Sequence, residues 1–156
     1  MAETCELCGG AADGQRGCQK LFEEDVLVKD YSDYRYGKTH RLTVDVYSLQ
    51  HPETYMISGK SFAAHLTGVC AALEYEDGAA TNRAMQKWLS TNPAIEKPSG
   101  IPRDRGSITI NYLIGAIDPE QHAKRVREWA DSVWGAWSDH HELARQLINK
   151  AIVHAG

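Results

Sequence analysis

The sequence lacks any long apolar run: no stretch of its 156 residues approaches the ~18 consecutive apolar residues that cross a bilayer. It also lacks an excess of basic residues, because 17 lysines and arginines stand against 21 aspartates and glutamates, for a net charge of −4. That balance creates no overall positive field toward nucleic acid. With no secretory leader either, we expect a cytoplasmic protein that has neither membrane nor nucleic acid as a partner.

Three common catalytic motifs are missing as well. Gly9 and Gly10 are not followed by the Lys-Ser/Thr pair of a phosphate-binding loop, and no helical HExxH pair is present. Ser58 and Ser61 lie near His65 in the sequence, but no GxSxG elbow accompanies them. The sequence therefore does not indicate an enzyme of the P-loop, HExxH zinc protease or serine hydrolase classes.

Cysteine is scarce, yet three of the four cysteines fall within the first 18 residues, in the pattern C-x2-C-x9-C. Cys5 and Cys8 lie on a turn released by two glycines, and thiolates in this arrangement bind a tetrahedral zinc ion, with Cys18 as the third ligand. A redox CxxC usually opens a helix after a strand, whereas no strand precedes this one. Disulfides are not expected in a reducing cytoplasm, so zinc is the expected cofactor, with redox-active or adventitious thiols as the alternative.

A closed zinc site needs a fourth ligand, and His40 and His51 are the leading candidates. On one straight helix these histidines lie eleven residues apart, or ~16 Å along the axis, so they cannot bind the same ion. Pro52 ends that helix and leaves the His51 side chain free to meet a loop. Asp13 is a weaker alternative, and Cys70 is expected in the core because its neighbours are apolar. The predicted ligands are Cys5, Cys8, Cys18 and His51.

We expect one domain over residues 1–156, because a chain of this length can bury a core of its own. Three prolines between Thr91 and Gly106 indicate a loop in the middle of the chain. The predicted organisation is a metal-binding knuckle at 1–18, N-terminal helices at 19–90, the Pro-rich loop at 91–106 and Trp-rich helices at 107–156.

Apolar spacing predicts helices through most of the N-terminal half. The first begins directly after Cys18. Ser58 is a suitable cap for the second, Gly78 breaks the pattern that follows, and Thr81 is a suitable cap for the third. These helices are expected over residues 19–31, 58–76 and 81–89.

The C-terminal half opens with a strong helix start at 118–120, where Asp is the cap, Pro takes the first helical position and Glu lies in the first turn. The helix that follows places Trp129, Val133 and Trp137 on one face. We expect a buried seam, with an aromatic ligand pocket as the alternative. Ser138 either caps a second helix or lies within one long, bent helix.

Residues 40–51 and 107–116 fit two structures. Apolar residues alternate with polar ones in both segments, which suits a strand. No third clear strand exists to complete a sheet, so we predict helix in both. The expected fold class is therefore all-α: a compact helical bundle with a zinc-knuckle-like CxxC loop at its N-terminus.

Several strings together resemble a known family. These are the N-terminal CxxCG with its further cysteine, HRLTVDVYSLQHP at 40–52 preceded by Tyr-Gly, KSFAAHL at 60–66, and the Trp-rich helix that ends at His140 and His141. The set is similar to a bacterial family catalogued only as a domain of unknown function. The match would cover most of the chain. The resemblance implies common membership and no particular reaction.

Histidine and aspartate cluster in the middle of the sequence. His40, Asp45 and His65 occur within 26 residues, and His140 joins them if the C-terminal helix packs back. Imidazoles and a carboxylate make up many catalytic zinc or iron sites, and Asp45 is alternatively an orienting group or general base. In the other interpretation these side chains have separate structural roles.

Two functions follow from these patterns. The first is a zinc-stabilised helical module that binds a small molecule or a protein, or regulates one. The alternative is a small metal-dependent enzyme that uses the His/Asp residues.

Overall fold

A computed structural model describes residues 3–156, and it confirms the all-α prediction. Within that range the only β pairing is an isolated antiparallel bridge between Thr4 and Ala11. The helices are α1 (Gly14–Lys20), the π-helix η1 (Leu21–Val26), α2 (Leu27–Ser32), α3 (Tyr34–Gly37), α4 (His40–Gln50), α5 (Pro52–Tyr55), α6 (Gly59–Glu74), α7 (Gly78–Leu89), α8 (Asn111–Ile114), α9 (Pro119–Ala136), the 3-10 helix η2 (Ser138–His140) and α10 (His141–Ala155).

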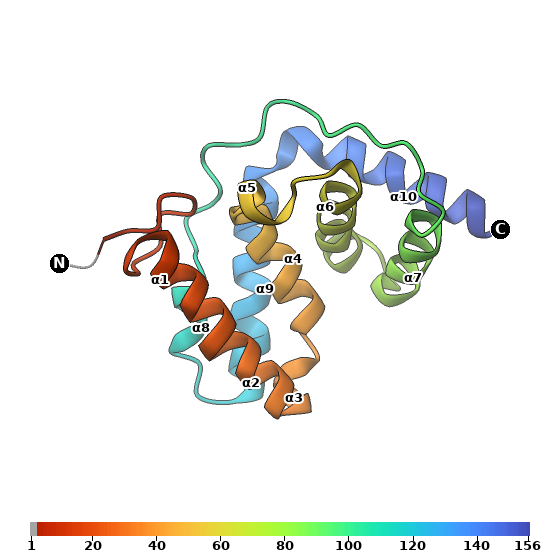
Figure 1. The fold of residues 1–156 in the computed structure, drawn as a ribbon. Coiled ribbons are helices and arrows are strands. Elements are labelled where there is room, and N and C mark those ends of the chain that lie inside the picture. The colour runs from red at the N-terminus through yellow and green to blue at the C-terminus, as the bar shows by residue number, and fades with distance from the viewer. Residues whose placement is uncertain (1–2) are drawn as a thin grey trace.

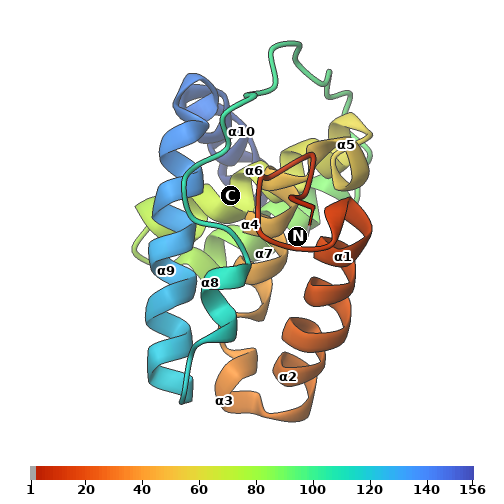
Figure 2. The same cartoon turned by 90° about the vertical axis from the view of Figure 1, so that its left-hand side faces the viewer.

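The core lies among the longer helices. Helix α4 packs against α6 and α9, and α6 in turn packs against α7 and α10 (Figure 1). Helices α1, η1 and α2 run on from one another as a rod over residues 14–32, with α8 between the rod and α9 (Figure 2). None of the described helices has both the length and the apolar character that a membrane span requires. The N-terminal loop therefore sits at one end of the rod, beside the end of α4.

Two helix starts follow the expected capping chemistry. The Ser58 hydroxyl accepts a hydrogen bond from the Ser61 amide, and the Ser61 hydroxyl accepts one from the Ser58 amide. Helix α6 therefore begins with a capping box. Asp118 accepts from the Gln121 amide at 2.7 Å, with Pro119 at the first position of α9. Both predictions are confirmed.

The predicted start of the third helix is wrong. The helical pattern is interrupted after α6, as expected, but Gly78 already begins α7, and the cap is Asp77, whose carboxylate accepts from the Ala80 amide at 2.9 Å. Thr81 lies inside that helix. A side chain at Gly78 would come within 2.9 Å of the Ala71 carbonyl oxygen, so the glycine permits a close approach of α7 to α6.

The rod also begins earlier than predicted. Helix α1 starts at Gly14, so Cys18 lies inside a helix and not before it. Gly14 has a φ of +67°, a conformation that favours glycine, and it forms the turn into the helix. Cys18 is therefore held by helical backbone, which fixes the position of its thiol.

The two segments that fit both a strand and a helix, 40–51 and 107–116, differ in how much helix they form. Residues 40–50 form α4, as predicted, but only Asn111–Ile114 of the predicted helix at 107–116 is α-helical. Residues 91–106 contain no helix, in agreement with the predicted loop. Helix α9 ends at Ala136, and η2 separates it from α10, so the C-terminal part is not one long helix. Ser138 makes no capping hydrogen bond there.

Candidate metal centre

A tight turn at the N-terminus presents two thiols. The Cys5 amide donates to the Gly10 carbonyl at 2.9 Å, and the Gly9 amide donates to the Cys5 carbonyl at 2.8 Å. Gly9 has a φ of +79°, which a side chain would strain. The Gly10 amide points at the Cys8 sulfur at 3.4 Å. The CxxCGG string thus folds because its glycines allow the reversal, and the backbone supports a thiolate at Cys8.

Cys18 reaches the same place from α1. Its side chain is fully buried. The Tyr47 hydroxyl of α4 donates to the Cys18 sulfur at 3.4 Å. The Tyr47 ring is stacked between Phe22 and His51, with ring centroids 3.9 Å apart on both sides. This aromatic stack holds the rod against α4 beside the thiols.

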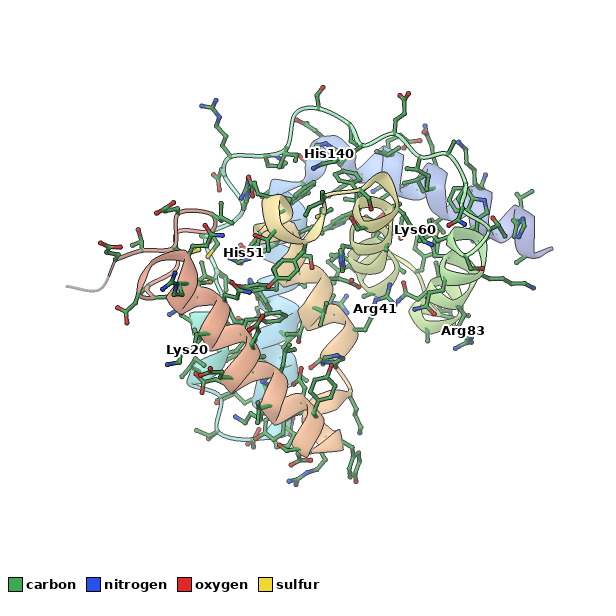
Figure 3. All side chains as sticks on the ribbon, viewed as in Figure 1. Lys20, Arg41, His51, Lys60, Arg83 and His140 are labelled. Carbon is green, nitrogen blue, oxygen red and sulfur yellow. The ribbon has the colours of Figure 1, made fainter. Side chains whose placement is uncertain are left out.

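His51 follows the last residue of α4. Its Nδ1 lies 2.7 Å from the Tyr47 carbonyl oxygen, which only accepts hydrogen bonds, so Nδ1 carries the proton. The Nε2 lone pair is then directed at the cysteines, and Figure 3 shows His51 facing the N-terminal loop. Metal-binding histidines are commonly oriented through the second nitrogen in this way. The end of α4 ahead of Pro52 leaves the imidazole free, as the sequence suggested.

The four predicted ligands come together, and we call them the Cys3His cluster. Their ligand atoms all lie within 4.8 Å of one another. The His51 Nε2 atom is 3.6 Å from the Cys5 sulfur and 3.4 Å from the Cys18 sulfur, and the Cys8 and Cys18 sulfurs are 3.8 Å apart. A tetrahedral zinc ion with ordinary bond lengths requires separations of about 3.8 Å for two sulfurs and about 3.6 Å for sulfur and nitrogen. The arrangement fits that ion.

The same distances exclude a disulfide in this structure. The Cys8 and Cys18 sulfurs are 3.8 Å apart, far beyond the ~2.05 Å of an S–S bond, and all four cysteines are free thiols. The hydrogen bond between these two sulfurs lowers the pKa of Cys18 to about 4 and raises the pKa of Cys8 above its usual range. Cys18 is therefore the thiol of the pair that ionises first, and the thiolate is the form that binds a metal.

Arg105 supports the cluster, although nothing in the sequence singled it out. Its guanidinium is buried and donates to the Leu7 carbonyl at 3.1 Å, inside the N-terminal turn. It also donates to the Gln50 carbonyl at 3.2 Å and pairs with the Glu53 carboxylate. One side chain thus joins the turn, the end of α4 and the start of α5. Burial opposes ionisation of Glu53, but Arg105 keeps the pKa of Glu53 below its usual value.

The structure does not gather His40, Asp45, His65 and His140 into one site. His40 pairs with Asp30, and its Nδ1 is 3.2 Å from that carboxylate. His65 pairs with Asp45 at 2.8 Å. His140 packs against the rings of Trp137 and Phe62, and burial lowers the pKa of its imidazole. Only Asp45 and His65, of these four, are in contact.

Asp45 is almost fully buried and carries two partners. The Arg41 Nε donates to one carboxylate oxygen and the His65 Nδ1 to the other, each at 2.8 Å. The carboxylate lies directly on Gly68 of α6, where an added Cβ would be 2.0 Å from an Asp45 oxygen. A glycine inside a helix costs ~1 kcal/mol relative to alanine. Gly68 is therefore needed to admit this ion pair between α4 and α6.

Replacing Gly68 by alanine is expected to lower the free energy of unfolding by about 1–3 kcal/mol, because the carboxylate must move and lose a hydrogen bond. Gly135→Ala in α9 is the matched control, since no atom lies within 4 Å of its added Cβ. That change should stabilise by about 0.5–1 kcal/mol through helix propensity. Urea denaturation of both variants measures the difference, and equal stabilisation would show that Gly68 has no packing role.

The chain belongs to a family of unknown function (DUF5946), whose family model matches residues 3–138. The matched segment contains the whole Cys3His cluster and stops within η2, before α10. No curated protein and no solved structure matches the chain. The membership inferred from the sequence is thus confirmed, and the geometry of the side chains has to carry the functional argument.

Proposed function

We propose that the Cys3His cluster binds one structural zinc ion and that the chain is a zinc-stabilised helical binding module. The observation that supports this most strongly is the meeting of four predicted ligands at the separations of a tetrahedral zinc site. Structural zinc sites use four protein ligands, whereas catalytic sites keep one position open. Three thiols and one imidazole fill all four positions.

The proposed zinc ion has a clear structural task. Cys5 and Cys8 belong to the N-terminal turn, Cys18 to α1 and His51 to the end of α4, so a single ion would join three segments. Arg105 already binds the N-terminal turn through the Leu7 carbonyl. Zinc would add bonds from the turn to α1 and to the end of α4, and would so hold the rod against α4.

The binding role is proposed for a cavity of about 440 Å³ between α6 and α7. Ala64 and Leu89 contribute apolar surface, and Lys60 and His65 contribute polar groups. Because Asp45 holds the His65 Nδ1, the opposite ring nitrogen remains available to a ligand. Figure 3 shows Lys60 on α6 close to α7. This combination suits a small, partly apolar molecule with an anionic group.

The zinc proposal is tested by elemental analysis of protein purified without oxygen, before and after mild chelation. One zinc ion per chain should survive chelation, and His51→Ala should release it as readily as Cys8→Ser. His65→Ala is the matched control, because this histidine lies outside the Cys3His cluster. Stoichiometric Cys8–Cys18 disulfide with no metal in freshly purified protein would overturn the proposal.

A metal-dependent enzyme is the second candidate, and one observation favours it. His40, one of the predicted catalytic residues, lies beside a buried carboxylate at Asp30. A metal ion with an open position would be expected there and not at the closed Cys3His cluster. Two metals per chain, one tightly held and one exchangeable, would support this alternative over the simple binding module.

A further inference from the structure

A second buried carboxylate lies at the opposite end of the rod from the cysteines. Asp30 of α2 has a fully buried side chain. Its Oδ2 is 3.2 Å from the His40 Nδ1 of α4, and its Oδ1 is 3.6 Å from the His122 Nε2 of α9. Three helices thus bring one aspartate and two histidines together. We call these residues the Asp30 cluster.

The Asp30 carboxylate forms no ion pair with a lysine or arginine among the described residues. Its ion-pair partners there are the two histidines. Asp45, the comparable buried carboxylate, has the guanidinium of Arg41 at 2.8 Å. A buried carboxylate without a compensating charge is costly. A bound cation would supply the charge that no lysine or arginine brings to the Asp30 cluster.

Unpaired polar atoms point to the same requirement. His122 is only 2% exposed, yet neither of its ring nitrogens has a hydrogen-bond partner within residues 3–156. The Asp30 Oδ1 lacks one as well. Buried polar atoms are almost always satisfied, and an exception is commonly explained by a bound water or ion. Here one imidazole and one carboxylate oxygen remain without partners side by side, 3.6 Å apart.

A cavity lies beside one member of the Asp30 cluster. His122 lines a cavity of about 490 Å³, whose walls also include Glu24 and Asp25 from η1 and Lys29 from α2. The two carboxylates attract cations, and the Lys29 ammonium is turned over the Tyr36 ring, 4.5 Å from its centroid. A small positive ion can therefore enter on the side where His122 is found.

We propose that the Asp30 cluster binds a divalent transition metal ion through Asp30, His122 and His40. Two imidazoles and one carboxylate are the ligand set of many zinc and non-haem iron sites with open positions. The 3.6 Å between the His122 Nε2 and the Asp30 Oδ1 matches two ligands of one ion with bonds near 2.1 Å. The open positions would face the cavity lined by His122.

His40 must turn to join the other two, because the histidines meet different oxygens of Asp30. Its side chain is 30% exposed, and its ring packs on Tyr31, which is itself 75% exposed. The imidazole is therefore less confined than that of His122. The metal would replace the direct His40–Asp30 contact with two bonds to one ion.

Cobalt titration separates the two metal sites. Zinc-loaded protein is treated with Co²⁺ under anaerobic conditions, and binding is followed by calorimetry and visible absorption. We expect one further equivalent of cobalt, with the weak bands of nitrogen and oxygen ligands. Cobalt that displaces zinc from the Cys3His cluster would instead show intense sulfur-to-metal absorption, so failure of one site is distinguishable from failure of the other.

Three variants assign the ligands. His122→Ala and Asp30→Asn should each weaken cobalt binding by more than the ~10–100-fold that loss of a supporting outer residue costs. His40→Ala should do the same, and its partly exposed position makes misfolding a smaller risk. His65→Ala, which removes a histidine from the other Asp–His pair, should leave binding unchanged. The proposal would be overturned if folded, zinc-loaded wild-type protein bound no equivalent of cobalt, or if all three variants bound cobalt as tightly as the wild type.

Discussion

Cys18→Ser is expected to abolish tight zinc binding and to lower the free energy of unfolding by at least about 4 kcal/mol, the range in which loss of a structural metal falls. Structural zinc contributes ~10–16 kcal/mol of apparent binding energy in small peptides that cannot fold without it. This chain has a core of its own around α4, α6 and α9, so a smaller loss is predicted. Each kcal/mol corresponds to about 2–4 °C in a domain of this size, and calorimetry measures the shift.

Cys70→Ala is the matched control for that experiment. Cys70 is also fully buried, and burial raises the pKa of its thiol to about 12, so it remains protonated. The substitution removes one thiol from the core of α6 without touching the Cys3His cluster. Zinc content should remain at one per chain. Loss of zinc in this variant, or its retention in Cys18→Ser, would contradict the assignment of ligands.

The loss of stability in Cys18→Ser should appear first near the Cys3His cluster and only later in the whole fold. In Cys18→Ser the rod loses its attachment through the metal and is left with side-chain contacts such as the stack of Phe22 on Tyr47 and the Asp30–His40 pair, while Arg105 still binds the N-terminal turn. Hydrogen exchange should therefore accelerate first over residues 14–32. The amides of α6, which is enclosed by α4, α7 and α10, should respond only through global unfolding.

Local chemistry explains which parts of the fold were predictable. Ser58 with Ser61, and Asp118 with Pro119, start helices by interactions within four residues, so the sequence shows them directly. The same reasoning failed at the start of α7, where Thr81 is the predicted cap but Asp77 caps a helix that begins at Gly78. That residue is a glycine because α7 passes close to Ala71, and a contact between two helices is not visible in the local pattern.

The cysteine spacing made most of the metal centre predictable. Cys5 and Cys8 are fixed by the turn between them, and Pro52 marks His51 as the histidine at a helix end. Arg105 was missed because its partners at Leu7 and Gln50 are 98 and 55 residues away. No short-range signal distinguishes an arginine that braces a loop from one that faces solvent.

The Asp30 cluster was missed for the same reason. His40 was noted as chemically interesting, but it was grouped with Asp45 because the two are near in sequence. The fold directs Asp45 toward Arg41 and His65 and brings Asp30 and His122 to His40. Nearness in sequence predicts a shared helix face only at spacings of three or four residues, and His40 and Asp45 are five apart.

Trp129→Ala is expected to destabilise the protein by ~3–5 kcal/mol. Trp129 is completely buried, together with Val133 and Trp137, as the predicted seam required. Its indole nitrogen donates to the Gln50 side-chain oxygen at 2.9 Å. The Gln50 amide in turn donates to the Ile108 carbonyl at 2.8 Å. The substitution therefore opens a cavity and also leaves a buried acceptor unpaired, so the effect should fall in the upper part of that range.

Two further variants divide this effect into its parts. Trp129→Phe keeps most of the ring but loses the bond to Gln50, and it should cost only the ~1–3 kcal/mol of an unsatisfied buried acceptor. Trp88→Ala in α7 removes an indole that is only partly buried, and it should cost clearly less than Trp129→Ala.

Because Trp129 belongs to the core and to the support of α4, the loss of unfolding free energy in Trp129→Ala, measured by urea denaturation, should be the same with and without small-molecule ligands. An unchanged free energy of unfolding in Trp129→Ala would instead favour the aromatic ligand pocket, since a ring that binds a ligand need not support the fold.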